Sequence, residues 1–98
     1  MNISGVTSDE LNIIKSILSN FKDKYKFFLY GSRVKGNFST LSDLDLLIRS
    51  ENIVNFSDIE TLKTLFDNSN LPYIVNISDY NTLDINFYNL IKKDLVEL

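Results

Sequence analysis

Apolar residues in some segments of this chain recur at the spacing of three and four that predicts a helix, and in other segments they form the short runs that predict a strand. Thr7 and Glu10 form a capping pair, and the spacing of three and four that follows predicts a helix over residues 8–21. The inward face of this helix comprises Leu11, Ile14, Ile17, Leu18 and Phe21. Residues 26–30, Lys-Phe-Phe-Leu-Tyr, form a short apolar run that ends at Gly31 and predicts a buried strand.

The second half of the chain continues this alternation. Residues 43–48 predict a second strand, and residues 73–78 predict a third. Between them, the capping pair Ser57 and Glu60 predicts the start of a short helix. The inward residues of that helix are Ile59, Leu62, Leu65 and Phe66. The tail, residues 84–96, predicts a last helix. We therefore expect one α/β (α+β) domain over the whole chain, with a small mixed sheet and helices packed on one face.

Composition narrows the classes of protein that fit this pattern. Of the 98 residues, 44% are hydrophobic, which is enough for one core and too many for a disordered chain. Cysteine is absent, so disulfides and thiolate metal sites are excluded, and we expect a reducing, cytoplasmic location. The first ten residues do not resemble a signal peptide, and no apolar run approaches the roughly 20 residues of a membrane span. The net charge of −3 gives no general electrostatic case for nucleic-acid binding.

Two aspartates carry the first candidate chemistry. Asp43 and Asp45 lie two positions apart in a predicted strand, so their side chains share one face, with Cβ atoms roughly 6–7 Å apart. A hard divalent cation, Mg²⁺ or Mn²⁺, would remove the repulsion between the two carboxylates and would use their oxygens as ligands. The alternative is a strand with a solvated acidic face. Because the chain has no histidine, any general base is expected to be a carboxylate.

A possible phosphate-binding turn lies about ten residues ahead of these aspartates. Gly31 allows a sharp turn directly after a strand, and Ser32 offers a hydroxyl and an N–H group to an anion. Arg33 and Lys35 could add charge-assisted hydrogen bonds, or they could simply be solvated. An isolated Gly-Ser pair is usually a plain turn. Together with the aspartate pair, however, it provides what phosphoryl and nucleotidyl transfer require, a phosphate site beside a metal site.

These residues resemble a known signature. Gly31-Ser32, Gly36 and Ser42-Asp43-Leu44-Asp45-Leu46 are similar to the G-S-x-x-x-G…S-D-x-D-L pattern of the polymerase beta-type nucleotidyltransferase superfamily, and the short chain resembles its minimal branch. The resemblance implies a polymerase beta-like palm fold and transfer of a nucleoside monophosphate from a nucleoside triphosphate to a hydroxyl. It also implies that the Gly-Ser turn holds the β and γ phosphates of ATP and that Asp43 and Asp45 bind Mg²⁺.

The resemblance further implies a partner. Minimal members often serve as antitoxins of an all-helical HEPN ribonuclease toxin, and some silence the toxin by adding AMP to one of its tyrosines. Larger enzymes of the superfamily carry additional domains for the acceptor, and we expect this short chain to rely on its partner instead.

The third predicted strand departs from the family pattern. Where the family has a third carboxylate, this chain has Asn76, which can offer an amide oxygen but cannot act as a base. Asp79 lies nearby but has the wrong strand parity, so it could substitute only at a strand end or bulge. The expected catalytic set is therefore Asp43, Asp45 and Asn76. Two hypotheses follow: a metal-dependent enzyme that AMPylates a toxin, or a binding module of the same fold that only masks it.

Overall fold

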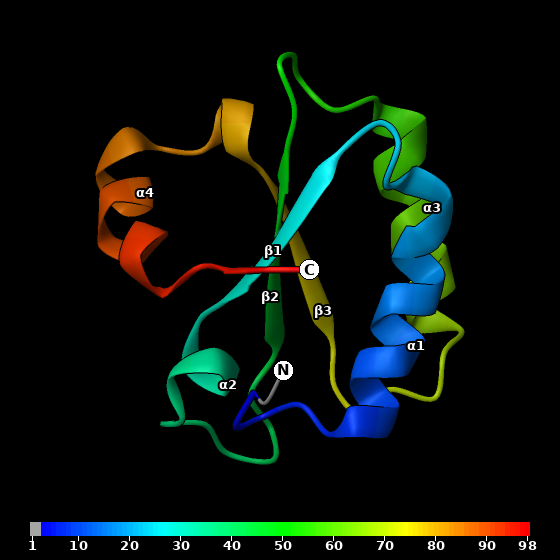
Figure 1. Ribbon diagram of the computed structural model, residues 1–98, viewed down its shortest axis with the longest axis vertical. Coiled ribbons are helices and arrows are strands. Elements are labelled where there is room, and N and C mark those ends of the chain that lie inside the picture. The colour runs from blue at the N-terminus through cyan, green and yellow to red at the C-terminus, as the bar shows by residue number, and fades with distance from the viewer. Residues whose placement is uncertain (1–2) are drawn as a thin grey trace.

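A four-stranded mixed sheet forms the centre of the molecule. The computed structural model describes residues 3–98, and the strands follow the order β3-β2-β1-β4 (Figure 1). Their bounds are β1 Lys26–Tyr30, β2 Leu44–Arg49, β3 Val75–Asp79 and β4 Val96–Glu97. Strand β1 runs antiparallel to β2 and β4, whereas β2 and β3 are parallel. The predicted small mixed sheet is confirmed.

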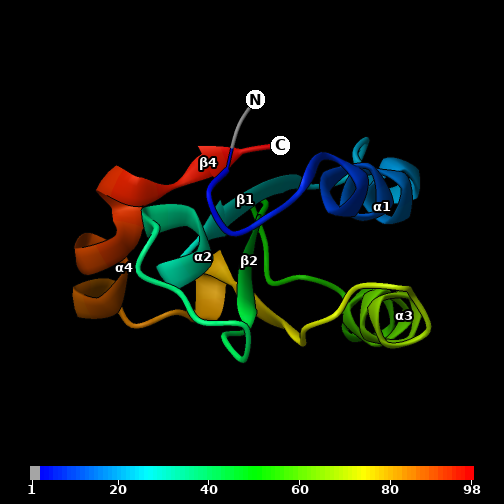
Figure 2. The ribbon, with the colours of Figure 1, turned by 90° about the horizontal axis from the view of Figure 1, so that it is seen from below.

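Helices α1 (Ser8–Leu18) and α3 (Phe56–Asp67) lie side by side on one face of this sheet (Figure 2). The core forms between them and the sheet, because alternate strand residues such as Leu44, Leu46 and Ile48 point toward the helices and are fully buried. The short elements are α2 (Ser32–Lys35), α4 (Ile85–Ile91) and the 3₁₀ turns η1 (Ser19–Phe21), η2 (Tyr80–Thr82) and η3 (Lys92–Asp94). No helix within residues 3–98 is both long and apolar enough to cross a membrane.

The N-terminal caps of the two long helices follow different patterns. The Thr7 hydroxyl accepts a hydrogen bond from the Glu10 N–H at 3.1 Å, and the Glu10 carboxylate accepts one from the Thr7 N–H at 3.0 Å, so this capping box is confirmed. The second capping prediction is wrong: α3 begins at Phe56, and its cap is Asn55, which accepts a hydrogen bond from the Ser57 N–H at 2.8 Å. Asparagine is an equally good cap, so local chemistry shifts the start of the helix.

Helix α4 differs from the expected one-sided packing, because it lies on the opposite side of the sheet from α1 and α3 (Figures 1 and 2). The ring of its Phe87 meets the ring of Tyr30 edge-on, with centroids 6.2 Å apart. The second face of the sheet also carries Leu47, which is fully buried. An apolar side chain on that face requires cover, and this requirement explains the position of α4.

The C-terminal tail is less helical than predicted. Helix α4 ends at Ile91, and after η3 the chain forms β4, which pairs with the free edge of β1 through Phe28 and Leu29. Val96 packs against the core in this arrangement. Pairing with β1 satisfies backbone groups that a longer helix would have left exposed at the sheet edge.

Candidate active site

The two aspartates predicted to bind metal converge on Asn76. Asp43 immediately precedes β2, Asp45 lies on β2, and Asn76 lies directly opposite Asp45 on the parallel strand β3. The Asn76 amide donates from Nδ2 to Asp43 Oδ2 at 3.0 Å and to Asp45 Oδ1 at 3.4 Å. The structure therefore brings together all three residues of the expected catalytic set.

The charge of this cluster is incompletely compensated. Burial raises the pKa of Asp45, and the neighbouring Asp43 charge raises it further, while the hydrogen bond from Asn76 lowers it. One neutral amide group thus serves two carboxylates. An opposite charge within a few ångströms would favour the ionised form of both aspartates. The local electrostatics therefore favour a bound cation.

The donor set fits a hard divalent cation. Within residues 3–98, no three His, Cys, Asp or Glu side chains lie close enough together to hold a metal ion, so Asp43 and Asp45 form a pair and not a triad. Mg²⁺ in nucleotide sites is often held by one or two carboxylates, with the remaining ligands supplied by phosphates and water. The amide of Asn76 can also present its oxygen after a half-turn about the Cβ–Cγ bond.

The Gly-Ser turn lies directly against this carboxylate pair. Gly31 has φ +89°, a conformation that favours glycine, and its carbonyl accepts hydrogen bonds from the N–H groups of Val34 at 3.1 Å and Lys35 at 3.0 Å. A Cβ atom added at Gly31 would collide with Oδ2 of Asp45 and lie 3.1 Å from its Cγ. Both the backbone conformation and the Asp45 side chain therefore require glycine here.

The turn and the Asp45 side chain line one cavity of about 340 Å³, which residues of α4 also line. Ser32, Lys35 and Asp45 line it, whereas Asp43 and Asn76 do not. Sequence reasoning missed Phe87 and Asp94, which line the opposite wall. The positions of these two residues in the sequence do not predict a place in the cavity, because that place depends on where α4 packs.

Tyr30 forms part of the floor of this cavity. It is buried, lies opposite Asp45 in the β1–β2 register, and its hydroxyl is 3.3 Å from Ser78 Oγ on β3. Burial raises the pKa of Tyr30, the hydrogen bond with Ser78 lowers it, and the Asp45 charge raises it. The phenol therefore remains protonated and neutral beside the carboxylate.

Arg33 lies elsewhere, contrary to the prediction that it binds phosphate. Its side chain is buried, and its guanidinium donates to the carbonyl oxygens of Ser42 at 2.7 Å and Gly5 at 2.9 Å. Two weaker hydrogen bonds reach the carbonyls of Ser39 and Thr40, and the ring centroid of Tyr73 is 4.0 Å away. With its donors engaged by backbone carbonyls, Arg33 instead fixes the loop that leads to Asp43.

Asp79 is also structural. It is buried at the far end of β3, and its carboxylate accepts hydrogen bonds from the N–H groups of Val54 at 2.8 Å and Asn81 at 2.9 Å. It pairs with Ile48, three positions along the strand from Asn76 and therefore roughly 10 Å away. Asp79 does not take the place of a third active-site carboxylate.

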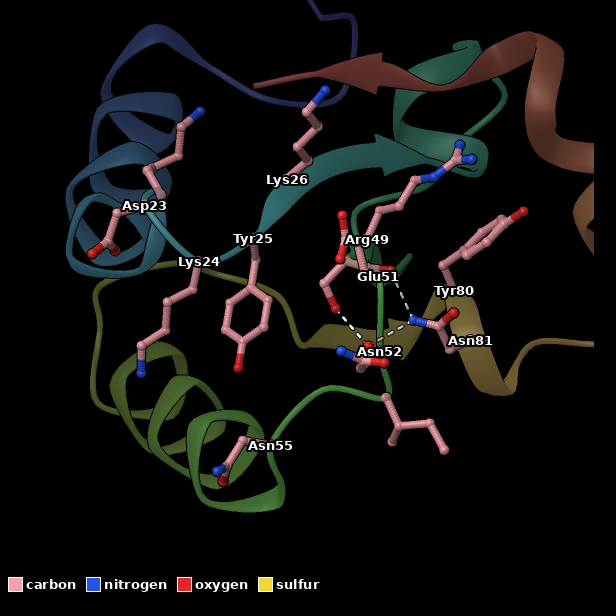
Figure 3. Close-up of a pocket in the computed structure, with 13 residues that line it drawn as sticks. Asp23, Lys24, Tyr25, Lys26, Arg49, Glu51, Asn52, Asn55, Tyr80 and Asn81 are labelled. Carbon is pink, nitrogen blue, oxygen red and sulfur yellow. Dashed lines mark hydrogen bonds between the residues drawn. The ribbon is translucent and has the colours of Figure 1, made fainter.

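A larger cavity, of about 940 Å³, lies around this far end of the sheet (Figure 3). The Asn81 amide in its lining donates to the carbonyls of Ser50 at 2.9 Å and Asn52 at 2.7 Å. None of the predicted site residues lines it. Size alone therefore does not identify the candidate site, whereas the uncompensated carboxylates do.

Comparison with known proteins gives two findings. A family model described as "Polymerase beta, Nucleotidyltransferase" matches residues 12–97. A protein of Haemophilus influenzae (strain ATCC 51907 / DSM 11121 / KW20 / Rd), named "Probable protein adenylyltransferase MntA", is 40% identical over 88 residues, which cover 90% of this chain and 77% of that protein. The family-matched range includes the Gly-Ser turn, the aspartate pair and Asn76.

Proposed function

The chain belongs to the polymerase beta nucleotidyltransferase family, and from this membership we propose that it transfers AMP from ATP to a hydroxyl group of a partner protein. The similar Haemophilus protein is named a probable protein adenylyltransferase, which supports AMP as the transferred group and a protein as the acceptor. In the proposed reaction the acceptor oxygen forms a bond to the α-phosphorus of ATP. The bond from that phosphorus to pyrophosphate breaks, and pyrophosphate leaves.

One observation carries this proposal: the Gly31 turn packs directly against the Asp45 carboxylate, so a phosphate site and a cation site adjoin. The N–H group of Ser32 and the ammonium group of Lys35 bind the β and γ phosphates in the proposal. Asp43 and Asp45 hold Mg²⁺ or Mn²⁺, which would neutralise charge on the phosphates. Asn76 orients the two carboxylates through its shared amide group.

We further propose that the acceptor is a tyrosine of a HEPN toxin and that the chain acts as its antitoxin. This step rests on the resemblance to minimal nucleotidyltransferases.

Asn76 supports a second candidate, a binding module that masks the toxin without modifying it. The third strand position holds a neutral amide that donates to both aspartates, so this position offers no carboxylate to take a proton from the acceptor. In this candidate, toxin neutralisation does not require Asp43 or Asp45.

Transfer of label distinguishes the two candidates. The chain and its HEPN partner are incubated with Mg²⁺ and ATP labelled at the α-phosphate, and label on the partner is measured. We expect labelling by the parent chain, a loss of at least about 100-fold in Asp43→Ala, and no change in the control Glu51→Gln at the far end of the sheet. ATP labelled at the γ-phosphate should leave the partner unlabelled. If the partner is inhibited but never labelled, and Asp43→Ala inhibits equally well, the chain is a binding module.

A further inference from the structure

We propose that the cavity between the Gly31 turn and α4 binds the nucleoside part of ATP, with the base stacked on the ring of Phe87. This inference rests on the proposed function, and it names a residue that no sequence motif marks. The cavity of about 340 Å³ lies within the size range of small-molecule sites, roughly 300–1,000 Å³.

The two walls of the cavity differ in chemistry as the two ends of a nucleotide do. One wall carries Ser32, Lys35 and Asp45, which suit phosphates and their cation. The wall formed by α4 carries Phe87, Leu90 and Ile91, which suit a planar apolar base, and Asp94 of η3 also lines the cavity. A nucleoside triphosphate with its phosphates at the Gly31 turn would therefore place its base toward α4.

Phe87 is held in place yet accessible. Its ring meets Tyr30 edge-on at 72°, and Tyr30 is in turn anchored by burial and by its contact with Ser78. Even so, 41% of Phe87 is exposed, and it lines the cavity. An edge-on contact with one ring covers at most one face of Phe87, and an ordered ring loses little entropy when a base stacks on it.

Each base stacked on an aromatic side chain typically gains about 5- to 150-fold in affinity, as judged by alanine substitution. The phosphates contribute separately, through the turn and the cation. Inorganic tripolyphosphate keeps that second contribution and lacks the base. Comparing the affinities of ATP and tripolyphosphate therefore separates the contribution of the nucleoside wall from that of the phosphate wall.

Calorimetry with ATP and with tripolyphosphate, both in excess Mg²⁺, tests this proposal. We expect the parent chain to bind ATP at least about tenfold more tightly than tripolyphosphate. Phe87→Ala should weaken ATP binding at least about fivefold and change tripolyphosphate binding less than twofold, whereas Phe87→Trp should preserve ATP binding. The matched control is Phe56→Ala, since Phe56 is 75% exposed at the start of α3, on the other side of the sheet.

Each other outcome overturns the proposal in a distinguishable way. Equal binding of ATP and tripolyphosphate by the parent, or unchanged ATP binding by Phe87→Ala, would leave the phosphate site and the proposed function standing without a nucleoside wall. Equal weakening of both ligands by Phe87→Ala would mean that Phe87 only positions α4. Unchanged ATP binding with weaker binding of the partner protein would assign this face of α4 to protein docking. If the parent bound neither ligand, the proposed function would fail as well.

Discussion

Each end of the β2–β3 strand pair carries one aspartate, Asp79 at the far end, which is buried, and Asp45 at the other end, which is half-buried. The hydrogen-bond donors that the two carboxylates find are of different kinds. Asp79, at the far end, accepts hydrogen bonds from two backbone N–H groups at 2.8 and 2.9 Å. Asp45, at the other end, shares one amide group with Asp43, and its pKa is raised by burial and by that second charge. Asp79 completes the fold, whereas Asp45 lacks a counter-charge.

This difference shows what marks a ligand site in a small domain. The far end encloses the larger cavity, about 940 Å³, where the Asn81 amide is bonded to the carbonyls of Ser50 and Asn52. The near end encloses about 340 Å³ lined by Asp45, whose carboxylate shares the Asn76 amide with Asp43. A buried polar group is normally satisfied by the protein itself, so two carboxylates that share one neutral donor indicate a ligand site better than cavity volume does.

Removing the Asp79 carboxylate, which accepts two backbone hydrogen bonds, should have the largest effect on stability. Asp79→Ala leaves the buried Val54 N–H without its acceptor and releases the η2 turn, so we expect the free energy of unfolding to fall by about 3 kcal/mol. Urea unfolding followed by circular dichroism measures this. The ATP affinity of the folded fraction should stay within twofold of the parent. A loss of ATP affinity with little loss of stability would mean that the two ends are not separate in function.

The glycines of the turn test the opposite end with a matched pair. Gly31→Ala adds a Cβ that collides with the Asp45 carboxylate, so we expect Mg²⁺-dependent ATP affinity to fall about thirtyfold, or about 2 kcal/mol. Gly36→Ala is the control, because Gly36 also has a positive φ, +96°, but only the Ser4 side chain lies nearby, at 3.6 Å. It should cost about 1 kcal/mol of stability and little affinity. Equal losses of affinity in the two variants would attribute the effect to backbone strain and not to Asp45.

The substitution Asn76→Asp removes the hydrogen-bond donor that Asp43 and Asp45 share. It replaces the shared amide donor with a third carboxylate, which would offer another metal ligand and a base for the acceptor hydroxyl. We expect AMP transfer to rise at least about tenfold, or about 1.4 kcal/mol of barrier, while stability without divalent cations falls. Label incorporation and urea unfolding, with and without Mg²⁺, measure the two effects. Transfer by the parent at the rate of Asn76→Asp would show that position 76 is not the third site.

The smallest effect is expected at the rim of the far cavity. The Lys24 ammonium lies 3.5 Å from the Asp58 carboxylate, and the Lys24 side chain is 58% exposed. Because exposed ion pairs contribute little, Lys24→Ala should lower the free energy of unfolding by less than about 0.5 kcal/mol and leave ATP binding unchanged. A clear loss of ATP binding in this variant would place a ligand-binding role at the far end as well.

Local patterns predicted most of the secondary structure and the central residues of the site. The boundaries of β1 match the prediction, and β2 differs by one residue at each end, because an apolar run bounded by turn residues is a local signal. The prediction failed where two local solutions were nearly equivalent, as for the Asn55 cap, or where a long-range contact decided the outcome, as for β4. Leu65 of α3, predicted to point inward, is exposed.

By itself, the sequence determined that Asp43 and Asp45 share a face and that a glycine turn precedes them, since side-chain alternation and the conformational freedom of glycine are properties of single segments. Only the tertiary structure decided that the Asn76 amide donates to both aspartates and that the buried Arg33 guanidinium donates to loop carbonyls. It also decided that Phe87 lines the cavity. These outcomes depend on strand pairing across about thirty residues and on which surface α4 must cover. Such contacts form because they bury the most apolar surface over the whole chain, and the periodicity of a single segment does not predict them.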